Sequence, residues 1–446
     1  MSTPVSRLID KLAADIRRGD LPPGSALPTH RKLAAQHGVA IASASKAYAQ
    51  LRSMGLVVGE TGRGTYVRDR PMQREWDIGD EARLSASAAD LSFNHPSWTG
   101  QADLLRVMLR DLASSGDLAA LMHQQPPGGR RHERQIVANF LASERGIRVD
   151  AECVFLVNGA QQGLDVTTRA LLGPHANVAV DALTYPGFKM LAKLQHLTLQ
   201  PVPAYPDGPD FDALERLCQR KRIQAIYAMP SLHNPLGWVF TDKQRIHLVE
   251  IARRYGCLLI EDASYAFLAG IKSGPALCSL APERTVYVSS FSKSLASGLR
   301  FGFIAVPRAY ATPIKAAVRA SSWSMPSVIT AMATRWIVDG TVVRQEKAMQ
   351  HEAQAKQTIA RQVLKGLDFA AHPASLFVWL KLPDELRMDR IATALAERGI
   401  AVSKGEAYAS TRHAPHALRL GLGSVPVEGL HAVLTQVRQT IERFPI

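Results

Sequence analysis

The feature that most constrains this chain is an alternation of apolar, strand-like runs with segments of helical periodicity between residues 154 and 289. It predicts strands at 154–157, 178–180, 223–228, 258–261 and 286–289, and helices at 161–171, 187–194 and 242–255. Such alternation indicates βαβ crossovers and a mostly parallel sheet, with a ligand bound beyond the carboxyl ends of the strands. Functional residues are therefore expected where these strands end.

The pattern changes after Trp323. A long polar helix at 343–367, strands at 376–382 and 417–420, and a final helix at 427–444 predict a smaller α/β domain. We therefore expect an α/β region over residues 91–446, with a large part at about 115–320 and a small part at about 321–446.

Composition restricts the class of protein. The chain has 446 residues, a length typical of two to four domains, and 46% of them are hydrophobic. No apolar run is long enough to span a membrane, and the N-terminus lacks the apolar core of a signal peptide, so we expect a cytoplasmic protein with no membrane partner. The four cysteines lack C-x-x-C spacing, which favours buried thiols, and no metal site is predicted.

Positive charge is concentrated near the N-terminus. The formal net charge is +14, and residues 1–70 hold 11 Lys or Arg against five Asp or Glu. An excess of positive charge favours anionic partners but says nothing about the fold. A solvated basic face and a surface that binds nucleic acid both agree with these counts.

The N-terminal residues predict three helices and a hairpin. The first helix ends at Gly19, the second is capped by Thr29 and ends at Gly38, and the third runs from about residue 41 to 54. Strands at 56–58 and 65–67 follow. Two short helices with a tight turn between them indicate a helix-turn-helix, and the hairpin indicates a wing.

Motifs in this region resemble the GntR winged-helix DNA-binding domain. They cover nearly all of residues 5–68 and read Ile16-x-x-Gly19, Pro23-Gly24-x-x-Leu27-Pro28-x-x-Arg31-x-Leu33-Ala34, Ala47-Tyr48-x-x-Leu51-x-x-x-Gly55 and Gly62-x-Gly64-Thr65-Tyr66-Val67. The resemblance implies a double-stranded DNA operator as partner. The DNA-contact candidates that it implies are Arg31, Ser43, Lys46 and Arg63. One position departs from the family, because Ile41 stands where an arginine usually opens the recognition helix.

Residues 70–90 separate the two regions. They lack sustained periodicity and mix small with charged residues, which predicts a linker after a DNA-binding domain at 1–69. The expected fold class is thus α/β, with an N-terminal winged helix-turn-helix.

A lysine among small hydroxyl residues follows the last of the predicted strands. The residues are Ser290, Ser292, Lys293 and, seven positions on, Arg300. The hydroxyls can bind phosphate oxygens, the lysine can reach an aldehyde, and the arginine can hold a phosphate through two N–H groups. A Ser-rich surface loop is the alternative. The stretch resembles the lysine motif of fold-type I pyridoxal 5′-phosphate enzymes of the aminotransferase kind.

Two other strand ends carry groups that suit this cofactor. Gly159, Ala160 and Gln161 open a helix, and backbone N–H groups at such a place bind phosphate, although a plain strand–helix turn has the same pattern. Asp262 ends a buried strand, and its carboxylate would keep the pyridine nitrogen protonated. A solvated acidic pair with Glu261 is the alternative.

The resemblance to fold-type I aminotransferases covers residues 91–446 and assigns further roles. It implies that Tyr185 stacks on the pyridine ring and that Asn234 and Tyr265 share its phenolic oxygen. Any catalysis would depend on Lys293, Asp262 and Tyr265. Arg419 would bind the carboxylate of an effector, with a structural salt bridge as the alternative.

The same resemblance implies a homodimer. The family usually has a tyrosine that reaches the phosphate of the partner subunit, and His123 or Gln124 stands near that place here. A GntR domain ahead of an aminotransferase-like domain is the architecture of MocR-type regulators. We expect a transcriptional regulator that senses a small amino compound, or pyridoxal phosphate itself, through an aldimine at Lys293. The alternative is a catalytically active, pyridoxal phosphate-dependent aminotransferase that carries a DNA-binding domain.

Overall fold

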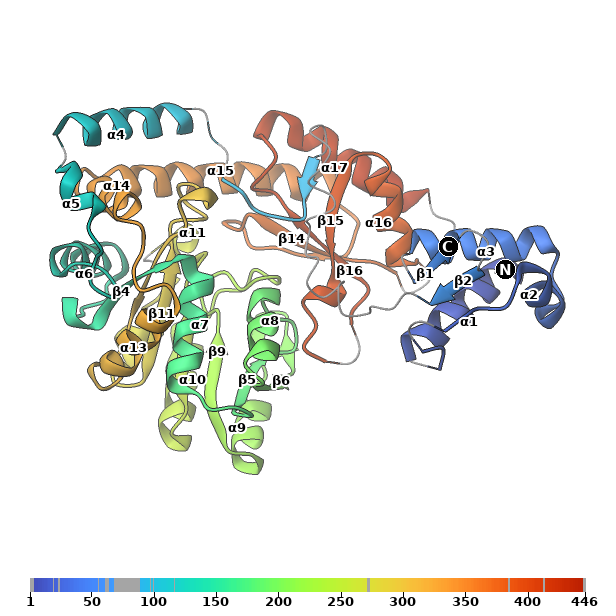
Figure 1. The fold of residues 1–446 in the computed structure, drawn as a ribbon, viewed down its shortest axis with the longest axis horizontal. Helices are drawn as coiled ribbons and strands as arrows, with labels where there is room; N and C mark the ends of the chain where they lie inside the picture. The colour runs from blue at the N-terminus through green and yellow to red at the C-terminus, as the bar shows by residue number, and fades with distance from the viewer. Residues whose placement is uncertain are drawn as a thin grey trace. The chain divides into compact units, whose positions relative to one another are not determined.

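The chain folds into two compact units, within residues 1–78 and 79–446 (Figure 1). The computed structural model describes residues 4–18, 20–22, 25–54, 56–60, 64–67, 89–96, 98, 100–115, 117–270, 273–383, 386–411 and 414–443. No helix in these ranges is long and apolar enough to cross a membrane.

The first unit is the winged helix-turn-helix that the sequence predicts. Its elements are α1 (Pro4–Arg18), α2 (His30–His37), α3 (Ile41–Ser53), β1 (Val57–Glu60) and β2 (Gly64–Val67). The Thr29 hydroxyl oxygen accepts the backbone N–H of Lys32 at 3.3 Å, and Gly38 ends α2 at a φ of 61°. The hydroxyl of the buried Tyr48 donates to the Pro28 carbonyl oxygen at 2.5 Å, which fixes the turn before α2 against α3.

A seven-stranded sheet forms the centre of the second unit. Its strands are β4 (Val154–Asn158), β5 (Asn177–Asp181), β6 (Thr198–Val202), β9 (Ile223–Ala228), β10 (Leu258–Asp262), β11 (Thr285–Ser290) and β12 (Phe301–Ala305). The order is β4-β12-β11-β10-β9-β5-β6, and β12 runs antiparallel to both of its neighbours. The prediction of a mostly parallel sheet is confirmed.

Helices cover both faces of this sheet. Ile260 and Val288 pack into the core with α7 (Gly159–Leu171), α8 (Pro186–Leu194) and α13 (Ala311–Ser321). Leu259, one position along the same strand, packs into the core with α9 (Phe211–Arg220), α10 (Asp242–Tyr255) and α12 (Leu277–Leu280). Because side chains alternate along a strand, Asp262 and Glu261 point to opposite faces of the sheet.

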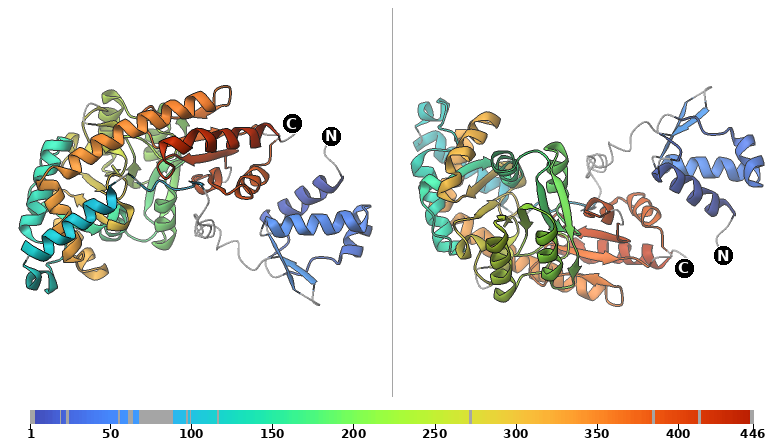
Figure 2. Two further views of the ribbon diagram at one scale, coloured as in Figure 1. Left: turned by 90° about the horizontal axis from the view of Figure 1, so that it is seen from above. Right: turned by 90° about the horizontal axis from the view of Figure 1, so that it is seen from below.

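A second sheet forms the smaller C-terminal part. Its order is β13 (Phe369–Ala370), β14 (Phe377–Lys381), β16 (Ala417–Gly421), β15 (Ile400–Lys404) and β3 (Ala89–Leu91). The helices α16 (Met388–Ala396) and α17 (Val427–Glu442) pack on it, and the long α15 (Thr341–Val363) packs beside α17 (Figure 2). The edge strand β3 includes Ala89 and Asp90, at the end of the range where we expected a linker.

The sequence analysis did not predict β3, β6, β12, β13, β15, α9, α12, α13 or α16, and it did not predict the remaining elements either. They are α4 (Gln101–Ser115), α5 (Leu118–Met122), α6 (Arg131–Arg145), α11 (Ala266–Ala269), α14 (Ser327–Val338), and the short hairpin of β7 (Ala204–Tyr205) and β8 (Gly208–Pro209). The helices α6 and α14 pack together beside β4, and α14 also contacts α4 and α5.

Candidate functional site

Lys293 lies in the turn between β11 and β12, at the carboxyl end of β11. Its Nζ atom donates a hydrogen bond to the backbone carbonyl oxygen of Asn94 at 2.9 Å. The lysine side chain is half-buried, whereas Ser290 and Ser292 on either side of Phe291 are buried. The lysine therefore sits in the sheet edge where the parallel strands end, as the sequence predicts for a ligand site.

Asn94 is a site residue that sequence reasoning missed. Its Nδ2 donates to the Tyr265 hydroxyl oxygen at 3.2 Å, and its Oδ1 accepts the backbone N–H of Gly423 at 3.0 Å. Both partners lie more than 150 positions away in the chain. Asn94 thus links the turn that carries Lys293 to Tyr265, which follows β10, and to Gly423, which follows β16.

Asp262 ends β10 in a buried position. Its Oδ1 accepts hydrogen bonds from the backbone N–H and the hydroxyl of Ser264 at 3.0 and 2.6 Å, and its Oδ2 accepts from the Tyr227 hydroxyl at 2.8 Å. Burial raises the pKa of Asp262, and these hydrogen bonds offset only part of that effect. A cation beside the carboxylate would lower the pKa again, so the position suits a protonated ring nitrogen.

The Tyr265 phenol lies in a positive environment. Burial alone would raise its pKa. The positive charges of Lys293 and Arg419 and the hydrogen bond from Asn94 outweigh this effect and hold the pKa of Tyr265 below its ordinary value. The Tyr265 ring meets the Phe377 ring edge to face, with centroids 5.2 Å apart. Tyr265 can therefore donate a hydrogen bond to an anionic oxygen placed between these cations.

Arg419 points into the same site from β16. It is buried, its Nη1 donates to the Ser92 carbonyl oxygen at 3.2 Å, and its guanidinium carbon lies 4.9 Å from the centre of the Phe377 ring. Within the described part of the chain, Arg419 forms no ion pair and its Nε has no hydrogen-bond partner. The structural salt bridge that we weighed for Arg419 is therefore not seen among these residues.

The N-terminus of α7 and Arg300 form a second cluster. Gly159 has a φ of 79°, and a Cβ atom there would lie 2.7 Å from Arg300 Nη2. Arg300 Nη2 donates to the Asn158 carbonyl oxygen at 3.3 Å, and β12 pairs with β4 so that Phe301 lies opposite Asn158. The strand pairing thus holds an arginine against free backbone N–H groups of a helix N-terminus, an arrangement that binds phosphate.

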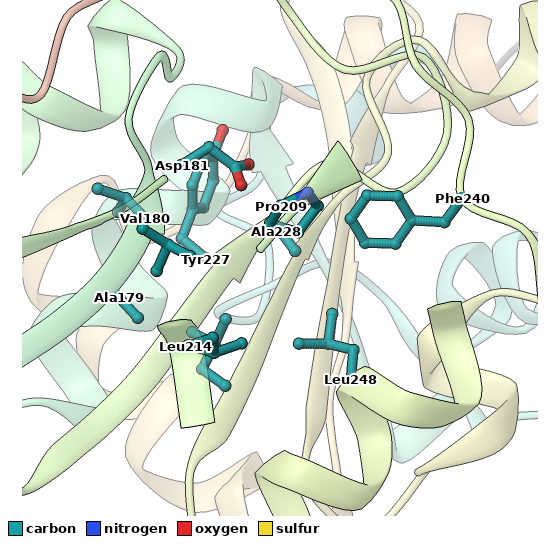
Figure 3. Close-up of a pocket in the computed structure, with 11 residues that line it drawn as sticks. Ala179, Val180, Asp181, Pro209, Leu214, Tyr227, Ala228, Phe240 and Leu248 are labelled. Carbon is teal, nitrogen blue, oxygen red and sulfur yellow. The ribbon is translucent and has the colours of Figure 1, made fainter. Parts of the chain in front are cut away.

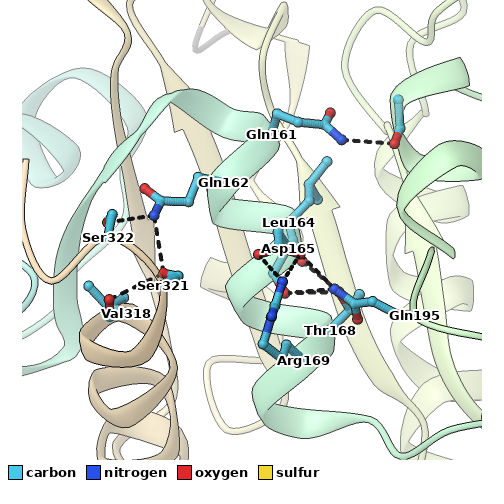
Figure 4. A network of polar contacts seen from close by, with 11 residues as sticks. Gln161, Gln162, Leu164, Asp165, Thr168, Arg169, Gln195, Val318, Ser321 and Ser322 are labelled. Atoms are coloured by element: carbon cyan, nitrogen blue, oxygen red, sulfur yellow. Dashed lines mark hydrogen bonds and ion pairs between the residues drawn. The ribbon is translucent and has the colours of Figure 1, made fainter. Parts of the chain in front are cut away.

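The first turn of α7 is fixed by side-chain amides (Figure 4). Gln161 Nε2 donates to the Gly187 carbonyl oxygen at 2.8 Å, and Gln162 Nε2 donates to the Ser322 hydroxyl oxygen at 2.6 Å. The Gly187 contact ties α7 to the start of α8, where Tyr185 stands at the N-cap. Burial raises the pKa of Tyr185, and its electrostatic neighbours include Asp262, Tyr265 and Arg300. Tyr185 and Gln161 therefore belong to the same site.

Asn234 lies in a buried loop after β9. The preceding His233 is buried, with Nε2 3.2 Å from Asp181 Oδ2 and its ring stacked on Trp238. His233 Nδ1 accepts the Leu236 backbone N–H at 3.3 Å, while Nε2 lies beside the Asp181 carboxylate. This pair anchors the loop that presents Asn234.

Two cavities elsewhere in this unit differ from the site. One, of about 20 Å³, lies between β5, β9, α9 and α10 and is lined by apolar side chains with Asp181 and Tyr227 (Figure 3). It holds no more than about one water molecule. The other, of about 410 Å³, is lined by Glu261, Arg145 and Glu346. In this cavity Arg145 Nη2 donates to both Glu346 oxygens at 2.6 and 2.7 Å.

The predicted DNA-contact residues lie on α2 and α3. Arg31 and Lys46 are exposed, and Ser43 is half-buried. Arg63 lies outside the described residues. The side chains of Arg31 and Lys46 are therefore accessible to the phosphates of a DNA backbone.

Comparison with protein families assigns both units. Residues 89–437 match the family described as aminotransferase class I and II, and this is most of the chain. The chain belongs to this aminotransferase family. Residues 4–67 match the family described as bacterial regulatory proteins, gntR family. A gntR-type domain ahead of an aminotransferase domain is the MocR-type architecture, as the sequence predicts, and the cofactor of the aminotransferase family is pyridoxal 5′-phosphate.

Similar proteins include regulators and enzymes. The chain is 27% identical over 408 residues to an uncharacterised HTH-type transcriptional regulator, YdeF of Bacillus subtilis, a match that covers 90% of this chain and 86% of the relative. It is 25% identical over 441 residues to PdxR, an HTH-type pyridoxine biosynthesis transcriptional regulator of Corynebacterium glutamicum, with 98% and 95% covered. An archaeal alanine:glyoxylate aminotransferase has the same fold, with a TM-score of 0.75, 21% identity, and 84% and 95% covered.

The residues of this aminotransferase-family site fit pyridoxal phosphate. Three of the buried polar atoms that lack a hydrogen-bond partner in the described part of the chain belong to predicted cofactor-binding residues: Ser292 Oγ, Asn234 Oδ1 and Gln161 Oε1. An unpartnered buried polar atom is costly, so such atoms mark a place for a polar ligand. Ser292 lies next to Lys293 in the turn after β11, Gln161 lies in α7 with Gly159, and Asn234 lies in the loop after β9.

Proposed function

We propose that this chain is a DNA-binding transcriptional regulator whose aminotransferase-like unit senses a small amino compound, or pyridoxal phosphate itself, at Lys293. The observation that carries the proposal is the presence, in one chain, of a winged helix with exposed Arg31 and Lys46 and of a site built around Lys293. The relatives that match both units carry the names of transcriptional regulators. Such a protein would act on DNA in the cytoplasm.

Each site residue has a role that its position supports. Bound pyridoxal phosphate supplies an aldehyde that reacts with amines and a ring that withdraws electrons when protonated. The Asp262 carboxylate would hold the proton on the ring nitrogen, and the Tyr185 ring would cover the cofactor and exclude water. Asn234 and Tyr265 would orient the cofactor through its phenolic oxygen. The phosphate would be bound by Gly159, Ala160, Gln161, Ser290, Ser292 and Arg300.

Arg419 would recognise an effector that carries a carboxylate. Its Nη1 is used by Ser92, but Nε has no partner among the described residues. A planar guanidinium with a free donor matches a carboxylate well. Since Ser92 follows β3, at the start of the second unit, this contact would connect effector binding to the segment that leads toward the DNA-binding unit. The domain limits of 1–69 and 91–446 remain part of this proposal, except that β3 begins at Ala89, so the linker expected at 70–90 ends before that residue.

The proposed homodimer would bury an apolar surface on α4 and α5. Met122 is 86% exposed and Val107 is 63% exposed, and Leu105, Leu109 and Leu118 are also exposed. A cluster of large exposed apolar side chains is typical of an interface. His123 and Gln124, which we expect near the partner's phosphate, are exposed beside Met122.

A second candidate function is a working aminotransferase. The observation in its favour is that Lys293 and Arg419 both lie close enough to the buried Tyr265 to lower its pKa, and that Tyr185 neighbours both Tyr265 and Asp262. Such a site can in principle move an amino group, and the structure of a known aminotransferase has the same fold.

One experiment separates the two functions. Purified full-length protein is treated with pyridoxal phosphate and borohydride, and peptide mapping should place the cofactor adduct on Lys293. A Lys315→Ala variant, altered at an exposed lysine of α13, should keep the adduct, and Lys293→Ala should lose it.

Amines are then screened by absorbance, with and without DNA. An amine that changes DNA affinity supports the regulator, because coupling between two sites is reciprocal. Turnover with an oxo acid at roughly 1 s⁻¹ or more, without any effect on DNA binding, would replace it with the enzyme.

A further inference from the structure

The recognition helix begins with an apolar side chain that its own unit does not bury. Ile41, the first residue of α3, is 51% exposed, and its neighbours Ala40 and Ala42 are exposed as well. The buried face of α3 consists of Ala44, Ala47, Tyr48 and Leu51. These four pack into the core with α1, α2 and the wing. Ile41 therefore contributes little to the packing of the winged helix.

Exposed cations lie on both helices of the helix-turn-helix. Arg31 on α2 and Lys46 on α3 are exposed, and no acidic residue occurs in α2 or α3. A helix-turn-helix places the N-terminal residues of its second helix against base edges in the major groove, with flanking cations on the phosphates. Ile41 would thus face bases rather than the backbone.

The chemistry of the major groove leaves one partner for an aliphatic side chain. Guanine, cytosine and adenine present polar donors and acceptors there, and only thymine among the standard bases presents a methyl group. The small side chains of Ala40 and Ala42 leave space for the helix to approach the groove closely.

We propose that Ile41 is a specificity-determining residue that contacts the C5 methyl group of a thymine in each half of the operator. This inference rests on the proposed function as a DNA-binding regulator. Ile41 selects a base by apolar contact, whereas Arg31 and Lys46 bind phosphates of any sequence.

The test begins with a selection of duplexes from a randomised DNA library by the full-length protein. Each thymine of the selected site is then replaced by uracil, which lacks only the methyl group. At one position in each half-site, uracil should weaken binding of the unaltered protein about fourfold, the value for burial of one methyl-sized group. Ile41→Ala should bind the thymine and uracil duplexes equally at that position. Ile41→Val should keep part of the difference.

Lys46→Ala is the matched control on the same helix. It should weaken binding to both duplexes and leave the ratio between thymine and uracil unchanged. If every uracil substitution affects the unaltered protein and Ile41→Ala alike, the inference on Ile41 is overturned while DNA binding stands. If the library yields no enriched sequence and no binding at low salt, the proposed function itself fails.

Discussion

The Nζ atom of Lys293 donates a hydrogen bond to the backbone carbonyl oxygen of Asn94, 2.9 Å away. The side chain of Asn94 also holds Tyr265 and Gly423, so one residue connects the lysine to both parts of the second unit. Asn94 lies only three positions after β3, the first strand of that unit. Lys293 is therefore hydrogen-bonded to a residue that lies close to β3 in the sequence.

Replacement of Asn94 by alanine should destabilise the second unit. It removes two buried hydrogen bonds and leaves the Gly423 N–H and the Tyr265 hydroxyl without these partners, at a cost of about 2–3 kcal/mol in the free energy of unfolding. Urea denaturation measures this change. The control is Asn139→Ala, which removes an exposed bond from Gln135 and should cost less than about 0.5 kcal/mol. Equal losses in the two variants would show that the Asn94 network does not stabilise the fold.

Local patterns predicted the elements with strong periodicity. The predicted limits 223–228 and 242–255 coincide with β9 and α10, because a mostly apolar run sets the first and a Thr241–Gln244 capping box sets the start of the second. Site residues at the ends of such apolar strands could be found in the same way, as Asp262 was at the end of β10. Asn94 could not, because its partners lie 171 and 329 positions away and its surrounding segment has no periodicity. The exposure of Ile41 likewise appears only once α3 is packed.

Gly159→Ala should weaken the binding of pyridoxal phosphate. The residue has a φ of 79°, which costs an alanine about 1–2 kcal/mol, and the added Cβ would lie 2.7 Å from Arg300 Nη2 and displace that guanidinium. We expect the dissociation constant, measured by absorbance titration, to rise roughly tenfold or more because a charge-assisted hydrogen bond is lost.

Gly173→Ala is the matched control for this glycine. Gly173 follows the same helix, and a Cβ atom there would have no heavy atom within 4 Å. Its affinity for pyridoxal phosphate should stay within about twofold of the unaltered protein, a change of less than about 0.5 kcal/mol. If both variants bind the cofactor normally, the phosphate does not lie at the start of α7.

Val107→Glu should shift the protein from dimer to monomer. Val107 is 63% exposed on α4, and a buried carboxylate without a partner would oppose association through that face. Light scattering gives the mass in solution. Ile246→Glu on α10, at a side chain that is also exposed, should leave the dimer intact. A protein that is monomeric before any substitution, yet fully loaded with cofactor, would contradict the proposed interface.

Arg31→Ala should weaken binding to all DNA sequences equally. An exposed arginine that neutralises one phosphate contributes roughly −0.9 to the slope of log affinity against log salt concentration. The slope of the variant should therefore be flatter by about one unit, as measured by fluorescence anisotropy between low and physiological salt. A loss confined to particular sequences would mean that Arg31 reads a base instead.

Glu261 should make the second unit less stable as the pH rises toward neutrality. Burial raises the pKa of Glu261 from 4.5 to about 7, although the N–H groups of Cys278 and Leu277 and the charge of Arg245 oppose that rise. A carboxyl with a raised pKa binds its proton more tightly in the folded state. The corresponding stability is fully present below pH 4.5 and is lost as the pH rises through 7. The loss amounts to about 3 kcal/mol at 1.36 kcal/mol per pKa unit.

The Glu261→Gln side chain cannot ionise, so between pH 5 and 8 the urea midpoint of this variant should fall less than that of the unaltered protein. The control Glu397→Gln, at an exposed position, should show the pH dependence of the unaltered protein. If Glu261→Gln shows the same pH dependence as the unaltered protein, ionisation of Glu261 does not lower the stability of the second unit over this pH range.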